Sequence, residues 1–157
     1  MNNVIKFIIA LGLPLLVGFA GSYFTITGVD SWYATINKPS WNPPNSVFGP
    51  VWTTLYVLMG IAWFIVWKSD APASYKNRAS SLFIAQLILN FSWSFIFFYR
   101  HQVGWAFAEI AVLWLFILFT IFAFAKVSRL AAWLLVPYIS WVSFAAILNY
   151  TIWQLNK

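Results

Sequence analysis

The chain alternates between five long apolar segments and short polar connections. The segments cover about residues 5–27, 46–67, 79–99, 105–125 and 130–153. About 20 consecutive apolar residues are needed for a helix to cross the hydrocarbon core of a bilayer. Each segment reaches that length, and little chain remains for a water-soluble domain. The pattern predicts an all-α fold, an integral membrane five-transmembrane-helix bundle that forms a single domain over residues 1–157.

Composition supports the same fold class. Hydrophobic residues make up 62% of the chain and charged residues 8%, whereas soluble domains have about 45–50% apolar and about 25% charged residues. The formal charge of +6 comes from basic residues scattered singly along the chain. Such residues are typical of membrane-flanking positions, so we expect no nucleic acid partner. The first segment is too long for a signal peptide, and we expect it to be a retained helix.

The basic residues also predict an orientation, because cytoplasmic loops carry an excess of lysine and arginine. The N-terminus, the second loop and the fourth loop share one side and hold six of them: Lys6, Lys68, Lys76, Arg78, Lys126 and Arg129. The opposite side holds three: Lys38, Arg100 and Lys157. We therefore expect a cytoplasmic N-terminus.

Few side chains in this chain could support metal or nucleophilic chemistry. There is no cysteine, one histidine and only three acidic residues. A thiolate nucleophile is therefore excluded, and a metal site built from several histidines or carboxylates is not expected. We expect no metal centre and no cofactor.

The first connection, residues 28–45, differs from the other loops in length and composition. Three prolines prevent it from being one continuous helix: Pro39, Pro43 and Pro44. It also carries four large apolar residues: Trp32, Tyr33, Ile36 and Trp41. Two interpretations remain open. The segment is either an interfacial loop with aromatic anchors or a lid over one end of the bundle.

Polar and aromatic side chains inside the segments suggest where a ligand could bind. Gln86 and Asn90 lie one helical turn apart, and Asn149 lies in the last segment. These amides could join helices or contact a ligand. An aromatic stripe follows the second segment at Trp52, Tyr56, Trp63 and Trp67. Such a stripe either fills the bundle or lines a cavity for a flat ligand, and Trp52, Asn90 and Trp141 fit the second interpretation.

Several motifs resemble one known family. They are Lys38-Pro-Ser-Trp-Asn-Pro-Pro44, Phe48-Gly-Pro-Val-Trp-Thr-Thr-Leu-Tyr56, Gln86-Leu-Ile-Leu-Asn90, Gln102-Val-Gly-Trp-Ala106 and Leu148-Asn-Tyr150. Together they resemble the tryptophan-rich sensory protein/translocator protein family (TspO/MBR, once called the peripheral benzodiazepine receptor). The resemblance extends over nearly the whole chain. The basic pI and the absence of cysteine indicate a bacterial member, and hence a bacterial cell membrane.

The resemblance implies a ligand and a site. Family members are usually dimeric and bind porphyrins such as protoporphyrin IX, isoquinoline carboxamides and benzodiazepines in a pocket on the first-loop side. The implied pocket residues here are Tyr33, Trp52, Asn90, Trp93, Trp141 and Ala145. Some bacterial members photo-oxidise the porphyrin with two pocket tryptophans, which gives Trp52 and Trp141 a hypothetical catalytic role. Lys38 could then meet a porphyrin carboxylate near the interface.

Three functions therefore remain open. The first is a membrane receptor or sensor for tetrapyrroles, the second a light-dependent porphyrin-degrading enzyme, and the third a tetrapyrrole transporter. Cholesterol is not an expected partner, because Gln154 stands where the sterol motif of animal members has arginine. A homodimer is expected from the resemblance, but a small-residue dimer pattern reported in the third helix of some relatives is absent here.

Overall fold

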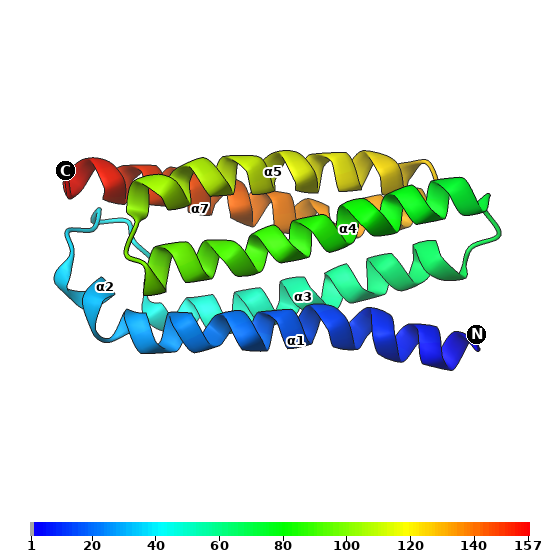
Figure 1. Ribbon diagram of the computed structural model, residues 1–157, viewed down its shortest axis with the longest axis horizontal. Helices are drawn as coiled ribbons and strands as arrows, with labels where there is room; N and C mark the ends of the chain where they lie inside the picture. The colour runs from blue at the N-terminus through cyan, green and yellow to red at the C-terminus, as the bar shows by residue number, and fades with distance from the viewer. Residues whose placement is uncertain (1) are drawn as a thin grey trace.

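The computed structural model describes residues 2–157 and contains five helices that are long and apolar enough to cross a membrane. They are α1 (Asn3–Val29), α3 (Asn45–Lys68), α4 (Ala73–Ser94) continued by η1 (Phe95–Tyr99), α5 (Val103–Ala125), and the pair α6 (Arg129–Leu134) and α7 (Val136–Leu155). They run side by side along the long axis of the molecule, and the two termini lie at opposite ends (Figure 1). The predicted five-helix membrane bundle is confirmed.

Two of the helices differ from the sequence-based expectation. The third spanning helix begins at Ala73, six residues before the expected start at residue 79, and its last five residues form a π-helix, η1. The fifth spanning helix is interrupted at Leu135, between α6 and α7. Pro137 follows two residues later, and proline has no backbone N–H to continue the ladder of hydrogen bonds. Hydropathy does not register such a break, because the residues on both sides are apolar.

Small residues bring α1 and α3 into close contact. A Cβ atom on Gly60 would lie 2.8 Å from the Ala10 carbonyl oxygen and 2.8 Å from the Leu11 Cα atom. About two turns of α1 nearer the lid end, Gly18 lies directly against the ring of Tyr56. Small residues allow helix backbones to approach in membranes. This contact fixes α1 against α3 and presses the Tyr56 ring toward the bundle interior.

The aromatic stripe on α3 divides into two parts with different surroundings. Trp63 stacks on Trp67 with ring centroids 5.1 Å apart, and on Phe83 of α4 at 5.0 Å. Phe83 in turn stacks on Phe124 of α5 at 5.8 Å. These rings fill the bundle at the end where α3 ends and α4 begins. The other half of the stripe, Trp52 and Tyr56, lies toward the opposite end, where the bundle is hollow.

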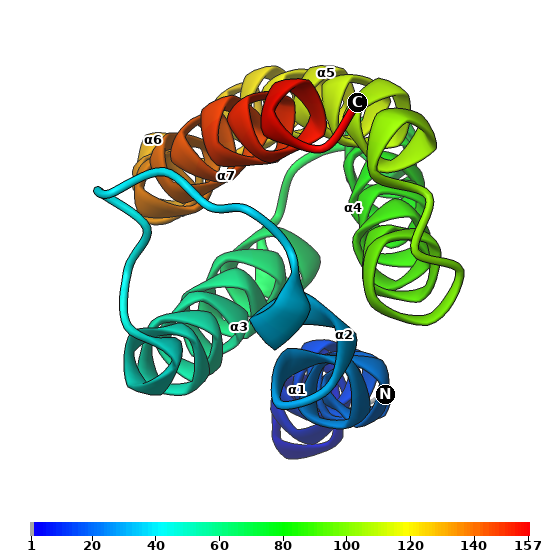
Figure 2. The same cartoon turned by 90° about the vertical axis from the view of Figure 1, so that its left-hand side faces the viewer.

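Residues 28–45, called the lid segment below, cross the end of the bundle opposite the N-terminus. The segment contains one short helix, α2 (Trp32–Thr35), followed by extended chain that leads into α3. Viewed from this end, it passes over the space enclosed by the five long helices (Figure 2). A cavity lies beneath the lid segment.

Candidate functional site

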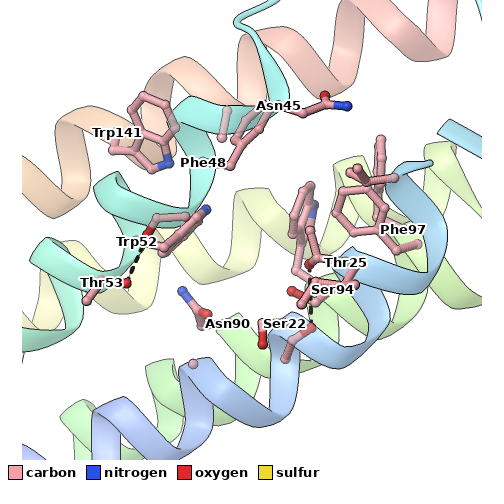
Figure 3. A pocket seen from close by; sticks show the side chains of 18 of the residues that line it. Ser22, Thr25, Asn45, Phe48, Trp52, Thr53, Asn90, Ser94, Phe97 and Trp141 are labelled. Carbon is pink, nitrogen blue, oxygen red and sulfur yellow. Dashed lines mark hydrogen bonds between the residues drawn. The ribbon is translucent and has the colours of Figure 1, made fainter. Parts of the chain in front are cut away.

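One cavity of about 560 Å³ lies beneath the lid segment. Its walls come from α1, α2, α3, α4, η1 and α7. All six residues that the sequence analysis named as a ligand site line it: Tyr33, Trp52, Asn90, Trp93, Trp141 and Ala145. Three positions far apart in the chain, on α3, α4 and α7, therefore converge on a common space (Figure 3).

Two tryptophans form the wall between α3 and α7. The Trp52 indole stacks on Tyr56 with centroids 5.7 Å apart and meets the edge of Tyr138 at 6.3 Å. Trp141 on α7 is held edge-on by Phe48 at 6.2 Å. The Nε1 atom of Trp141 is buried and has no hydrogen-bond acceptor among the described residues. A buried donor without a partner is costly, so Trp141 offers an N–H group to a ligand that brings an acceptor.

A chain of hydrogen bonds forms the floor of the cavity. The Tyr56 hydroxyl donates to Asn90 Oδ1 at 2.6 Å, and Asn90 Nδ2 donates to the Tyr138 hydroxyl oxygen at 2.9 Å. The Tyr138 hydroxyl donates to Gln86 Oε1 at 2.7 Å. The chain joins α3, α4 and α7. Gln86 therefore serves to hold helices together, whereas Asn90 both joins helices and lines the cavity.

A second amide pairs with the remaining cavity indole. Trp93 Nε1 donates to Asn149 Oδ1 at 3.0 Å, and Asn149 Nδ2 donates to the Val103 carbonyl oxygen at 2.9 Å. Asn149 thus connects α4, α5 and α7 at the lid end. Because its indole N–H is already bonded, Trp93 offers a ligand its ring surface rather than a hydrogen bond.

The lid segment closes the cavity with Tyr33. This side chain is 3% exposed and packs against Phe97 and Phe98 at centroid distances of 6.0 and 5.7 Å. Its hydroxyl donates to Asn42 Oδ1 at 2.7 Å. Tyr33 thereby joins the short helix α2 to the extended half of the lid segment, and its ring faces the cavity.

The lid segment is also tied to the end of α7. The Asn37 backbone N–H donates to Asn156 Oδ1 at 2.9 Å, and Asn156 Nδ2 donates back to the Asn37 carbonyl oxygen at 2.8 Å. The Asn37 side chain adds a bond to the Leu155 carbonyl oxygen at 3.3 Å. These two asparagines close a contact between residues more than a hundred positions apart in the chain.

Charge is absent from the cavity wall formed by residues 2–157. Lys38 does not line the cavity. Its ammonium group donates to the carbonyl oxygens of Tyr33 and Ile36 at 2.6 and 2.9 Å, and it lies over the Tyr33 ring. The lysine therefore stabilises the lid segment from within. A carboxylate brought by a ligand would find no cation inside the cavity.

Sequence reasoning did not assign the α1 wall. Gly21, Ser22 and Thr25 line the cavity from α1, and Phe48 and Phe97 complete the aromatic lining. Small and hydroxylated residues on a membrane helix are typical of a close helix contact. That interpretation holds for Gly18, which touches Tyr56, but one and two turns later the same face of α1 borders empty space.

The cavity reaches the outer surface between α1 and α3. Some of its lining residues are also exposed: Phe19 and Ile26 on α1, and Gly49 and Thr53 on α3. A Cβ atom on Gly49 would meet nothing within 4 Å. The two helices are tightly packed at Gly60 and separate toward the lid end, so the site has an opening on the side of the bundle that faces lipid.

Burial of Tyr33 predicts a loss of lid stability in alkali. Desolvation raises the pKa of the Tyr33 phenol to about 12, although the hydrogen bond to Asn42 acts in the opposite direction. An exposed tyrosine has a pKa of about 10. The closed lid therefore retains its full stability below pH 10 and loses it as the pH rises through 12, because the open state releases the proton first.

An ultraviolet difference titration of the protein against Tyr33→Phe checks this expectation. One phenol present only in the unaltered chain should ionise near pH 12. A difference signal centred near pH 10 would show that Tyr33 is solvated and the lid segment open.

Comparisons with known proteins give a consistent answer for the whole chain. The sequence profile described as the TspO/MBR family matches residues 10–154. The tryptophan-rich protein TspO of Chlorobaculum tepidum is 46% identical over 99% of this chain and 98% of its own length. The translocator protein of Homo sapiens is 42% identical, covering 91% of this chain and 85% of its own. The tryptophan-rich sensory protein of Cereibacter sphaeroides is 36% identical over 97% and 90%. The chain belongs to the TspO/MBR family, as the motifs in its first loop and second spanning helix had indicated.

Proposed function

We propose that the protein is a membrane receptor or sensor for flat, largely apolar ligands, with protoporphyrin IX and isoquinoline carboxamide or benzodiazepine compounds as its ligand classes. The observation that carries this proposal is the cavity of about 560 Å³ with aromatic walls and an unpaired indole N–H. Its volume falls in the range of about 300–1,000 Å³ usual for small-molecule sites.

The lining favours stacking over charge recognition. Indole and phenyl faces from α3, α4, η1 and α7 can lie against a macrocycle, since offset and edge-on ring contacts are favourable. The porphyrin carboxylates would remain outside the uncharged cavity, because burying an unpaired carboxylate costs far more than ring stacking gains. The opening between α1 and α3 extends toward the lid end, at Gly49 and Ile26, so the carboxylate-bearing edge would lie at that end, by the membrane surface, and not in the hydrocarbon.

A light-dependent porphyrin-degrading enzyme is the second candidate. The positions of Trp52 and Trp141 favour it, because both indoles line the cavity and would contact a bound macrocycle. An indole can serve as electron donor to a photoexcited ring, while the lid segment limits access of water. The chain's own contribution to such a reaction would be to hold the ring and the two indoles in contact.

The setting of the receptor forms part of the proposal. The protein is an integral membrane protein, and we place it in a bacterial cell membrane, with the N-terminus in the cytoplasm and the lid segment on the outer side. This orientation rests on the six-to-three distribution of basic residues between the two sides. Family resemblance supports a homodimer, and the substitution at Gln154 argues against cholesterol as a partner.

Titration with protoporphyrin IX in the dark tests the proposal. Ala145 lines the cavity, whereas Ile147, two residues later on the same helix, is 60% exposed on the outer face. A tryptophan at position 145 would occupy the space of the ligand, and we expect Ala145→Trp to weaken binding at least ~10-fold. Ile147→Trp adds the same ring on the outside and should leave binding unchanged.

The matched pair makes a negative result informative. If both variants bind the porphyrin as tightly as the unaltered protein, the ligand lies elsewhere and the cavity is not the receptor site. If the unaltered protein binds neither protoporphyrin IX nor an isoquinoline carboxamide, the proposed function is wrong.

A further inference from the structure

The single histidine of the chain stacks on the lid segment. The His101 imidazole lies flat against the Trp32 indole, with ring centroids 4.4 Å apart and an interplanar angle of 14°. His101 follows the π-helix η1 and has φ of 56°, in the left-handed region. Histidine tolerates this conformation better than most residues do. The turn after η1 therefore places the ring beside α2 rather than beside its own helix.

Trp32 connects this stack to the closure of the cavity. Its other aromatic contact is an edge-on packing against Phe97, a cavity residue, at 5.5 Å. The next residue along α2 is Tyr33, whose ring closes the cavity. Trp32 is thus held between Phe97 and His101, and α2 cannot lift from the bundle without separating the imidazole from the indole.

We propose that His101 is a positioning residue whose charge sets how firmly the lid segment closes over the cavity. Histidine is the side chain whose charge changes between pH 5 and 8. A cation over the face of a tryptophan is attracted by the ring quadrupole. Protonation of His101 therefore tightens its stack on Trp32, so the cavity opens more often as the pH rises through this interval.

The neighbouring charges do not replace this effect. Arg100 precedes His101, and Asp30 lies two residues before Trp32, so one charge of each sign flanks the stack along the chain. Lys38 directs its ammonium group to the Tyr33 and Ile36 carbonyl oxygens. Tyr99, at the end of η1, stacks on Phe95 with ring centroids 5.1 Å apart. Glu109 on α5 lines a surface pocket together with Arg100 and Gln102, the two neighbours of His101 in the chain. Its carboxyl is the further titratable group on this side, and it is the same in the His101 protein and in every His101 variant.

The lid segment has a second attachment that does not titrate. The paired amide bonds between Asn37 and Asn156 hold its other flank. Because amides keep the same charge from pH 5 to 8, loss of this pair should open the lid segment equally at every pH. The two attachments differ in chemistry, and this provides a control for the histidine.

Cysteine accessibility measures lid opening without any ligand. The chain contains no cysteine, so Ala145→Cys places a single thiol inside the cavity. Charged methanethiosulfonates reach it from water and do not cross the lipid-facing side. Labelling rates at pH 5.5 and 8 are compared between the His101 protein and His101→Asn, both carrying Ala145→Cys, which cancels the ionisation of the thiol. We expect His101→Asn to accelerate labelling about 2–5-fold more at pH 5.5 than at pH 8.

Further variants distinguish closure from other effects. His101→Phe keeps a stacked ring without a charge, so at both pH values it should label at about the rate of the His101 protein at pH 8. Asn156→Ala should accelerate labelling by the same factor at both pH values. An anionic and a cationic reagent should give the same result, because lid closure slows both. An equal effect of His101→Asn at both pH values, or a response that reverses with the sign of the reagent, would overturn the proposal.

The inference extends the proposed binding function but can be tested apart from it. Dissociation of an isoquinoline carboxamide, which carries no carboxylate, should slow from pH 8 to 5.5 in the His101 protein and not in His101→Phe. A pH-dependent labelling rate without any carboxamide binding would support the positioning role of His101 and contradict only the proposed function.

Discussion

Replacing Trp141 with phenylalanine is expected to weaken binding of an isoquinoline carboxamide roughly 10–100-fold without destabilising the free protein. The Trp141 Nε1 atom is buried and has no acceptor among the described residues. A hydrogen bond from this donor to the ligand carbonyl would be lost in the variant, and leaving a buried acceptor unpaired costs about 1–3 kcal/mol. In the free protein the same substitution removes an unsatisfied donor while keeping an aromatic ring.

Trp141→Phe should weaken ligand binding without lowering the stability of the free protein, whereas general damage to the fold would lower both. Binding is measured by titration in the dark, and stability by thermal unfolding in the same detergent. Trp133→Phe is the matched control, because Trp133 lies on α6 and is 70% exposed. It should change neither quantity. A Trp141→Phe protein that unfolds earlier and binds normally would mean that the indole N–H has a structural partner and does not meet the ligand.

Substitution of Trp141 together with Trp52 distinguishes the receptor from the light-dependent enzyme. A protein with both Trp52→Phe and Trp141→Phe keeps an aromatic ring at each position but lacks the two indoles proposed as electron donors, while Trp93 remains in the cavity. If degradation uses these indoles, illumination should bleach bound protoporphyrin IX in the unaltered protein and at least ~10-fold more slowly in the variant. Equal bleaching in both would remove the enzymatic candidate and leave a receptor.

The fold could be predicted because a membrane-spanning helix can be recognised from a long run of apolar residues alone. Twenty apolar residues in a row leave a helix as the only arrangement that satisfies the backbone in lipid. The details that escaped prediction depend on contacts instead. The π-helix at Phe95–Tyr99 and the interruption at Leu135 change hydrogen bonds but not hydropathy. The early start of α4 at Ala73 comes from polar residues, which a hydropathy pattern assigns to the loop.

The site could be predicted in part, because only some of its residues are of types that are unusual on a lipid-facing helix surface. Trp52, Asn90 and Trp141 are unusual residues for a lipid-facing surface, so sequence alone could mark them as inward-facing. Gly21, Ser22 and Thr25 are ordinary residues of a packed helix, and only the separation of α1 from α3 turns them into a cavity wall. The position of Lys38 could not be predicted either, since its partners are backbone carbonyls of its own loop.

Replacing Asn90 with leucine is expected to destabilise the protein by about 2 kcal/mol. Asn90 accepts from the Tyr56 hydroxyl and donates to the Tyr138 hydroxyl, and it is 4% exposed. Hydrogen bonds between membrane helices average about 0.6 kcal/mol and reach about 1.7. A buried group left without a partner costs about 1–3 kcal/mol. Leucine would leave the Tyr56 hydroxyl with no acceptor on α4, so the larger value applies.

A double-variant cycle shows whether the lost partner or the changed shape is responsible. Removing both members of a buried pair is nearly neutral, because no polar group remains unsatisfied. Tyr56→Phe combined with Asn90→Leu should therefore be more stable than Asn90→Leu alone, as measured by unfolding in mixed detergent. If the two substitutions simply add, Tyr56 is solvated in the cavity and the chain of hydrogen bonds does not hold the floor. Recovery of stability would instead mean that one unpaired group in this chain of hydrogen bonds is what destabilises the protein. Tyr56 on α3 and Tyr138 on α7 would then hold the Asn90 side chain in its position at the cavity before any ligand binds.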